Sequence, residues 1–335
     1  MLPADFCQQP ENMRRTAEMC IIALLVLIGC TTKKSRPSLL TKPGSGGRSY
    51  EILVTGSNYS AVEATAQALR DIKMEGLPRE EAAFEVSTIV NYELNQNTRY
   101  ARNLVVVTTD STQLLRTRFT FNLDIYAYPQ LLIRIEAPST ERLKEDLADN
   151  MKTISDEITR AEMNNAIKNL RDHHNERAEE IISSNFNCRL WIPEDLNKMK
   201  QGRHFLWFSN DGTSGMQNIC IYSYAADSLS PTIMLQKRDS VMKRNIGGEQ
   251  PGTYMATTLR SVSFHLRSEN DTRVLGARGL WEMEGDNMGG PFVSMARSMA
   301  DSVLCIEGFV YAPEMNKRNL IRRLEAALYT LKITD

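Results

Sequence analysis

The feature that most constrains this chain is a run of ten apolar residues, Cys20–Gly29, preceded by the basic pair Arg14 and Arg15. A helix needs about 20 apolar residues to cross a bilayer, so this run is too short to span one. Its length and the basic residues before it are typical of a secretory signal peptide. We therefore expect residues 1–29 to be removed from the mature protein.

The residues that end this run indicate a lipid anchor. Leu27-Ile28-Gly29-Cys30 resembles the lipobox of bacterial lipoproteins, in which the cysteine is acylated and becomes the new amino terminus. A buried element that happens to end in cysteine is the alternative, but the position next to a signal peptide favours the lipobox. Several acyl chains, palmitate among them, give stable membrane anchorage where one chain is marginal. We expect Cys30 to be lipidated.

The first twelve residues look unlike a signal peptide, because they carry Asp5 and Glu11 ahead of the basic pair. Met13 begins such a segment well, so we predict that translation starts there.

The residues after Cys30 suggest a location. Thr31 rather than aspartate follows the cysteine, which resembles lipoproteins sorted to the outer membrane, and no acidic cluster of the kind associated with surface export follows. We expect an outer membrane protein of the cell envelope, lipid-anchored and facing the periplasm. Residues 30–48 are rich in Ser, Pro, Gly and Lys and predict a flexible tether.

The charge balance excludes one class of partner. Residues 1–29 hold two of the 40 basic and three of the 41 acidic side chains, so the mature chain has 38 of each. Nucleic-acid binding needs a basic surface, and we expect none here.

The hydrophobic pattern predicts an α+β fold with two similarly ordered halves of antiparallel or mixed sheet and flanking amphipathic helices. In each half a strand-like run ends in Ala-Pro, at Ala137-Pro138 and Ala312-Pro313, and passes into a helix. An old duplication or chance explains this recurrence, since Pro is favoured in the first turn of helices. We place the first half at 49–170, a helical connection at 171–184 and the second half at 185–335. The expected strands lie at 50–54, 103–109, 119–125, 130–136, 188–192, 205–209, 218–224, 261–266, 273–284 and 302–311, and the expected helices at 61–72, 140–182 (as two helices), 232–244 and 317–331.

The sequence offers little recognisable chemistry. It has four histidines, with His173-His174 expected on a solvated helix face, and it lacks nucleophile-elbow, Walker and dinucleotide-binding motifs. Cys188, Cys220 and Cys305 have no CxxC spacing, so one disulfide and three reduced thiols both remain open. We expect no cofactor and no metal site.

One glycine-rich segment is a candidate binding loop, because paired glycines let a backbone approach a ligand closely. Simple turn formation explains the same glycines. The candidate residues are Arg278, Trp281, Asp286, Asn287, Gly289 and Gly290.

Several segments together resemble an uncharacterised family of Bacteroidetes lipoproteins known only as a domain of unknown function. They are Tyr128-Pro129-Gln130, Arg238–Val241, Asn245–Gly248, Gly252–Met255, Arg278–Trp281, Met288–Ser294, Glu307–Pro313 and Lys317-Arg318. The resemblance covers nearly all of the chain from Tyr50 onward. It implies export and lipidation, but no activity and no catalytic residues.

These observations favour a non-enzymatic binding or scaffolding module of the envelope, with the membrane and an envelope protein or glycan as partners. The rival is a periplasmic hydrolase acting on envelope material, with Asp286 or Glu284 working beside Trp281. A third possibility is carbohydrate or peptide binding through exposed aromatic residues.

Overall fold

A computed structural model of the chain describes residues 42–90, 98–212, 215–225, 229–248, 250–269 and 272–334. Contacts group residues Pro43–Asp335 into one compact unit. The predicted signal peptide, the start at Met13 and the lipidation site Cys30 lie outside the described residues. Within the described part, no helix is long and apolar enough to cross a membrane.

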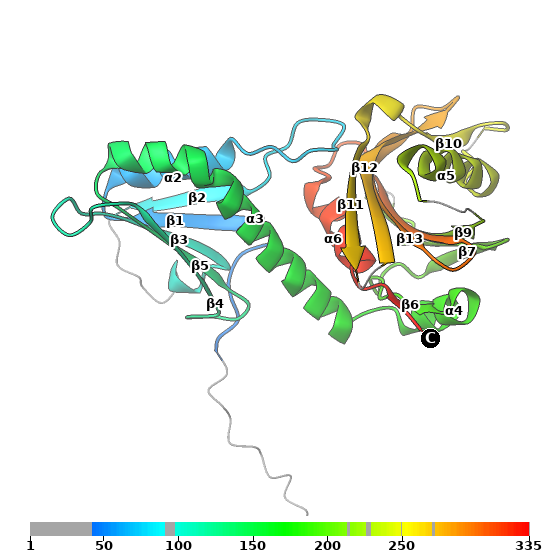
Figure 1. Cartoon of the computed structure of the whole chain (residues 1–335), viewed down its shortest axis with the longest axis horizontal. Helices are drawn as coiled ribbons and strands as arrows, with labels where there is room; N and C mark the ends of the chain where they lie inside the picture. The colour runs from blue at the N-terminus through cyan, green and yellow to red at the C-terminus, as the bar shows by residue number, and fades with distance from the viewer. Residues whose placement is uncertain are drawn as a thin grey trace, which may run out of the picture. The chain divides into compact units, whose positions relative to one another are not determined.

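The first half contains a five-stranded mixed sheet with the order β2-β1-β3-β5-β4 (Figure 1). Strands β2, β1, β3 and β5 are parallel to one another, and the edge strand β4 is antiparallel to β5. The strands are β1 (Glu51–Gly56), β2 (Glu85–Val90), β3 (Asn103–Thr109), β4 (Arg118–Leu123) and β5 (Leu131–Ala137), and a short 3-10 turn, η1, covers Thr98–Tyr100.

Helices α2 (Tyr59–Arg70) and α3 (Thr140–Asp172) pack against one face of this sheet. The Asn58 side chain caps α2 by accepting from the backbone N of Ala61 at 3.2 Å. The predicted apolar stripe of α3 faces the core, where Leu143, Leu147, Ile154 and Ile158 are buried.

The predicted pair of helices between residues 140 and 182 is present, with one break. Helix α3 ends at Asp172, and α4 (Glu176–Phe186) begins after its cap Asn175. Helix α3 continues through Asn164-Asn165, because packing over a long helix overrides the low helix propensity of two residues.

The second half is built on an eight-stranded antiparallel sheet with the order β10-β12-β13-β14-β9-β8-β7, in which β11 also pairs with β12. Helix α6 and the short β6-β15 pair lie against one apolar core of this half, and α5 against a second core. The elements are β6 (Cys188–Arg189), β7 (Lys198–Gly202), β8 (Phe205–Ser209), β9 (Met216–Tyr224), α5 (Pro231–Asn245), β10 (Tyr254–Thr257), η2 (Leu259–Ser261), β11 (Ser263–Glu269), β12 (Thr272–Glu284), β13 (Gly289–Ser298), β14 (Val303–Tyr311), α6 (Arg318–Leu328) and β15 (Lys332–Ile333).

The α+β class predicted from the sequence is confirmed. The two sheets nevertheless differ in strand direction, since the first is largely parallel and the second antiparallel. The last residues of the predicted tether also differ from expectation. Gly46 donates its backbone N–H to the carbonyl of Tyr100 at 2.8 Å and accepts from the N of Arg102 at 2.9 Å, so this segment is joined to the first half. Amino-acid composition, from which the tether was predicted, does not reveal backbone hydrogen bonds of this kind.

Helix α6 contacts both halves. Its apolar side packs on the second sheet through Ile321, Leu324 and Leu328. At its start, the Glu81 carboxylate of the first half accepts from the backbone N of Lys317 at 2.8 Å and of Arg318 at 3.0 Å. This charged cap satisfies donors that a helix terminus leaves free.

Two arginines of α6 continue this contact. Arg318 donates from Nη1 to the carbonyl of Ala82 at 2.8 Å, and Arg322 donates from Nη1 to that of Ala83 at 2.7 Å. Arg318 is 6% exposed and so is Arg322, so α6 is fixed to the first half by buried charged hydrogen bonds.

Candidate functional site

The candidate binding loop lies at the hairpin between β12 and β13. The Trp281 ring is buried at 2% exposure, lies 5.6 Å from the Phe309 ring and donates from Nε1 to the carbonyl of Val310 at 3.3 Å. Arg278 points to the opposite face of the sheet, because three positions along a strand invert the side. There its Nη2 lies 2.5 Å from Oε2 of Glu325.

The other four candidate residues serve the hairpin. Asp286 accepts from the backbone N of Asn287 at 2.7 Å within the turn. A Cβ atom at Gly290 would lie 2.0 Å from the carbonyl oxygen of Val310, and one at Gly289 would lie 2.9 Å from that of Trp281. These glycines allow close packing of the strand, and the six candidate residues do not converge on one site.

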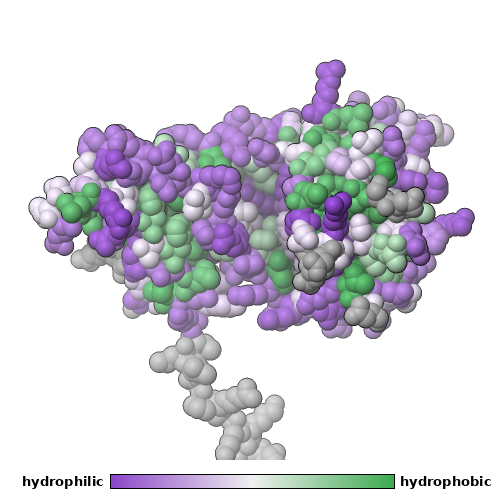
Figure 2. Space-filling model, viewed as in Figure 1, coloured by the Kyte–Doolittle hydropathy of each residue, from purple (hydrophilic) through white to green (hydrophobic). Residues whose placement is uncertain are grey.

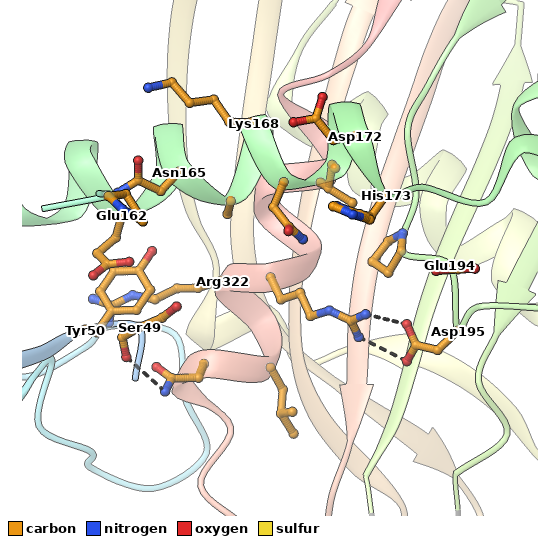
Figure 3. Close-up of a pocket in the computed structure, with 18 of the residues that line it drawn as sticks. Ser49, Tyr50, Glu162, Asn165, Lys168, Asp172, His173, Glu194, Asp195 and Arg322 are labelled. Atoms are coloured by element: carbon orange, nitrogen blue, oxygen red, sulfur yellow. Dashed lines mark hydrogen bonds and ion pairs between the residues drawn. The ribbon is translucent and has the colours of Figure 1, made fainter. Parts of the chain in front are cut away.

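A pocket of about 1120 Å³ lies elsewhere, among the end of α3, the start of α6 and the segment 193–197 (Figure 3). We call it the α3–α6 pocket. Its lining comprises Ser49, Tyr50, Arg102, Tyr128, Pro129, Glu162, Asn165, Ala166, Lys168, Asn169, Leu170, Asp172, His173, Pro193, Glu194, Asp195, Asn197, Asn319, Leu320, Arg322 and Arg323.

Part of the wall is a cation–aromatic stack. The Arg322 guanidinium carbon lies 3.9 Å from the centre of the Tyr50 ring. Burial raises the pKa of Tyr50 to about 12 and lowers that of Arg322 to about 10. At neutral pH the phenol is therefore neutral and the guanidinium is charged.

A buried ion pair forms a second part of the wall. The Glu162 side chain is 1% exposed and accepts from Nε of Arg102 at 2.8 and 2.9 Å. Nδ2 of Asn103 donates to the same carboxylate at 2.7 Å and to the carbonyl of Glu51 at 2.9 Å. The buried carboxylate therefore has both a charged partner and an amide donor.

Ion pairs also occupy the rim. Arg323 donates to both carboxylate oxygens of Asp195, and its charge lowers the pKa of Asp195 against the opposing effect of burial. Asp172 pairs with Arg171 at 2.9 Å between Oδ1 and Nε. In Figure 3 the Lys168 and Asp172 side chains extend away from Arg322.

Three amides on the lining are available to a ligand. The side chains of Asn165, Asn169 and Asn197 make no hydrogen bond within the described part of the chain. Tyr128, on the same lining, is 49% exposed, and its ring centre lies 5.8 Å from Nζ of Lys168. The pocket therefore presents free hydrogen-bonding groups beside an accessible aromatic ring.

Comparisons with known proteins divide the chain in two. Residues 45–171 match one family model, described as a domain of unknown function (DUF8532), and residues 175–330 match another, described in the same words (DUF4837). The chain consists largely of two domains of unknown function. This confirms the expected resemblance to an uncharacterised family over nearly the whole mature chain, and the descriptions state no activity.

No curated protein matches the chain. Among solved structures, it is similar to a crystal structure of a protein from Bacteroides thetaiotaomicron VPI-5482 at 1.50 Å resolution, with 13% sequence identity and a TM-score of 0.22. The match covers 45% of this chain and 46% of that chain, so the chain spans less than half the length of the matched structure. This similarity transfers no property to the chain.

The α3–α6 pocket takes its lining from both domains. Tyr50, Tyr128 and Glu162 belong to the DUF8532 domain, whereas Asp195 and Arg322 belong to the DUF4837 domain. A pocket shared by two domains is a common place for a ligand site.

A second pocket of about 830 Å³ also draws on both domains, with Arg322 in the lining of both pockets. Its lining includes His265, Tyr329 and the paired Arg278 and Glu325. Burial, and then Arg267, lowers the pKa of His265, so this imidazole is neutral at neutral pH.

His174 and the three cysteines have structural surroundings. His174 lies between the helices rather than on a solvated face, with Nε2 at 2.7 Å from Glu179 and Nδ1 at 3.0 Å from the carbonyl of Leu170. Cys188, Cys220 and Cys305 are free and buried. In the described residues no group of three or more His, Cys, Asp or Glu side chains is arranged to hold a metal ion.

The α3–α6 pocket was not predicted from the sequence, although one signal of it was present. Glu162 follows Ile158 by four positions and therefore continues the apolar stripe of α3, where a carboxylate has to be paired. Tyr50 and Arg322 gave no such signal, because 272 positions separate them in the chain.

Proposed function

We propose that this protein is a lipid-anchored envelope lipoprotein whose body is a non-enzymatic binding module, with the α3–α6 pocket as its ligand site. The observation that carries the proposal is the set of unbonded amides and the exposed Tyr128 ring in a pocket of about 1120 Å³ shared by two domains. Pockets with a few convergent polar groups are the default ligand sites of proteins.

The paired carboxylates favour binding over hydrolysis. General acid–base chemistry needs a carboxyl group free to gain and lose a proton near the operating pH. Glu162 and Asp195 are instead each paired with an arginine, Arg102 and Arg323 respectively. The Trp281 ring is buried. It therefore gives no support to a hydrolase site with Glu284 or Asp286 beside it.

The anchor is proposed from the sequence. A lipid on Cys30 would attach the body to the membrane, and we propose the periplasmic face of the outer membrane as its location. An envelope protein or glycan is the proposed partner.

Ligand retention tests the pocket. We expect protein purified gently from native envelopes to carry a small molecule that denaturation releases and mass spectrometry detects. Asn169→Trp should abolish this retention by filling the pocket, whereas Asn164→Trp, on the same helix but lining the second pocket, should not. Equal retention by both variants, or none by the unmodified protein, would contradict the proposal.

Labelling tests the anchor. Cells fed radioactive palmitate should label the protein, the label should vanish in Cys30→Ala, and globomycin should make the precursor accumulate. A protein that is exported without any label would rule out the anchor while leaving the pocket untouched.

A further inference from the structure

We infer that the α3–α6 pocket selects an uncharged, polyhydroxylated chain, an oligosaccharide. This rests on the proposal above that the pocket binds a ligand. Three observations carry it: the pairing of charges, the unbonded amides, and the exposed ring with the volume beside it.

The charges on the lining cancel without a ligand. The lining holds four Arg or Lys residues and four Asp or Glu residues. Arg102 is paired with Glu162 and Arg323 with Asp195. Arg322 is occupied by the carbonyl of Ala83 and the Tyr50 ring. A charged ligand would have to displace these partners, whereas a neutral one leaves them in place.

The remaining charged residues on the lining give the pocket no net charge. Asp172 has Arg171 as its partner, and Lys168 lies over the Tyr128 ring. Glu194 lies on the exposed rim opposite α3 (Figure 3). One cation and one anion at the solvent edge do not select a ligand by charge, because solvent and salt screen them.

The unbonded amides match hydroxyl groups. Each of Asn165, Asn169 and Asn197 offers two donors and one acceptor oxygen, and a hydroxyl group both donates and accepts. Polar groups of a ligand that are removed from water need such partners. Purely apolar ligands would leave all three amides without partners.

The exposed ring and the volume complete the match. Tyr128 has a half-exposed ring, and the apolar C–H face of a sugar ring packs on an aromatic face. The pocket volume of about 1120 Å³ exceeds the roughly 300–1,000 Å³ usual for drug-sized ligands, so several sugar rings fit.

Calorimetry with defined sugars tests this inference on the full chain. The probes are maltohexaose, cellohexaose, mannohexaose and chitohexaose, with hexagalacturonate as the charged comparison and an uncharged hexapeptide as the non-sugar comparison. We expect at least one neutral sugar to bind and its Kd to change less than twofold between 50 and 500 mM NaCl.

Variants then locate the binding. Tyr128→Ala should weaken it by about tenfold through loss of stacking, and Tyr128→Phe should restore most of it. Asn169→Leu should weaken it as well. Tyr59→Ala is the matched control, since that exposed ring does not line the pocket and the variant should bind normally.

The outcomes separate the two proposals. Binding of hexagalacturonate or the peptide in place of the neutral sugars, or no sugar binding by a protein that retains a native ligand, overturns the ligand class alone. Retention of a native ligand that Asn169→Trp leaves unchanged overturns the pocket itself. Neutral-sugar binding that is unaffected by Tyr128→Ala and Asn169→Leu also overturns the inference.

Discussion

Arg238 is completely buried, whereas arginine side chains are mostly exposed to solvent. Its side chain is 0% exposed in the middle of α5, with Nη2 at 2.7 Å from Oε1 of the equally buried Glu307 on β14. Nη1 donates to Oγ1 of Thr257 at 2.8 Å, and the guanidinium lies 4.1 Å from the Phe292 ring centre. Burial alone would lower the pKa of Arg238, but the Glu307 charge raises it. Burial raises the pKa of Glu307, and the charge of Arg238 opposes this effect.

This pair gives the residue-scale prediction. Arg238→Met should lower the free energy of unfolding by about 3–5 kcal/mol, because Glu307 is left buried without its charged partner. Adding Glu307→Leu should recover most of the loss. Urea denaturation measures both, and Arg244→Met, exposed on the same helix, should change stability by less than about 0.5 kcal/mol. A loss in Arg238→Met no larger than in that control would show that the pair does not stabilise the fold.

At the scale of elements, helices and strands were predicted where their own residues carry a hydrophobic or β-branched pattern. Strand β3 and helix α5 were expected nearly at their observed ends, since β-branched runs and helical periodicity are local signals. Strand β7 was missed, because Lys198–Gly202 is an exposed edge with no apolar alternation. The glycines and the proline at the start of β13 are typical of a turn in sequence, but in the structure they pair with β12.

The cap of α6 belongs to this scale, because Glu81 stabilises a helix that lies in the other domain. Glu81→Gln should reduce the free energy of unfolding by about 1 kcal/mol through loss of the charge at the helix amino terminus. Glu80→Gln is a matched control, since Glu80 is 73% exposed and pairs only with Lys73. Thermal unfolding of the two variants compares them, and equal midpoints would mean that the cap contributes nothing.

At the scale of the whole molecule, the pocket could not be predicted from the sequence. Tyr50, Tyr128, Asp195 and Arg322 come from separate elements of two domains, and only tertiary packing brings them to one place. A single sequence reveals periodicity within an element, whereas the register between distant elements depends on side-chain fit across the interface.

The polar contact made by α6 predicts how the domains unfold. Because Arg318 and Arg322 donate to backbone carbonyls of the other domain, calorimetry of the full chain should show one transition. Replacing both with Ala should split it into two, since each charged hydrogen bond contributes about 1.5–3 kcal/mol. Arg323→Ala, on the same helix but contacting its own domain at Asp195, should keep one transition. Two transitions in the unmodified chain would contradict this coupling.

The late position of α6 has a consequence for biogenesis. Arg322 donates to the carbonyl of Ala83 across 239 positions of chain, and its guanidinium lies over the rings of Tyr50 and Phe84. During synthesis from the amino terminus, the edge beside these two rings lacks the contact with α6 until nearly all of the chain has been made. Contacts this distant in sequence form slowly, and exposed apolar surface invites aggregation. A chaperone that binds this edge would protect it from aggregation. A nascent chain stopped before residue 318 would depend most on such a chaperone.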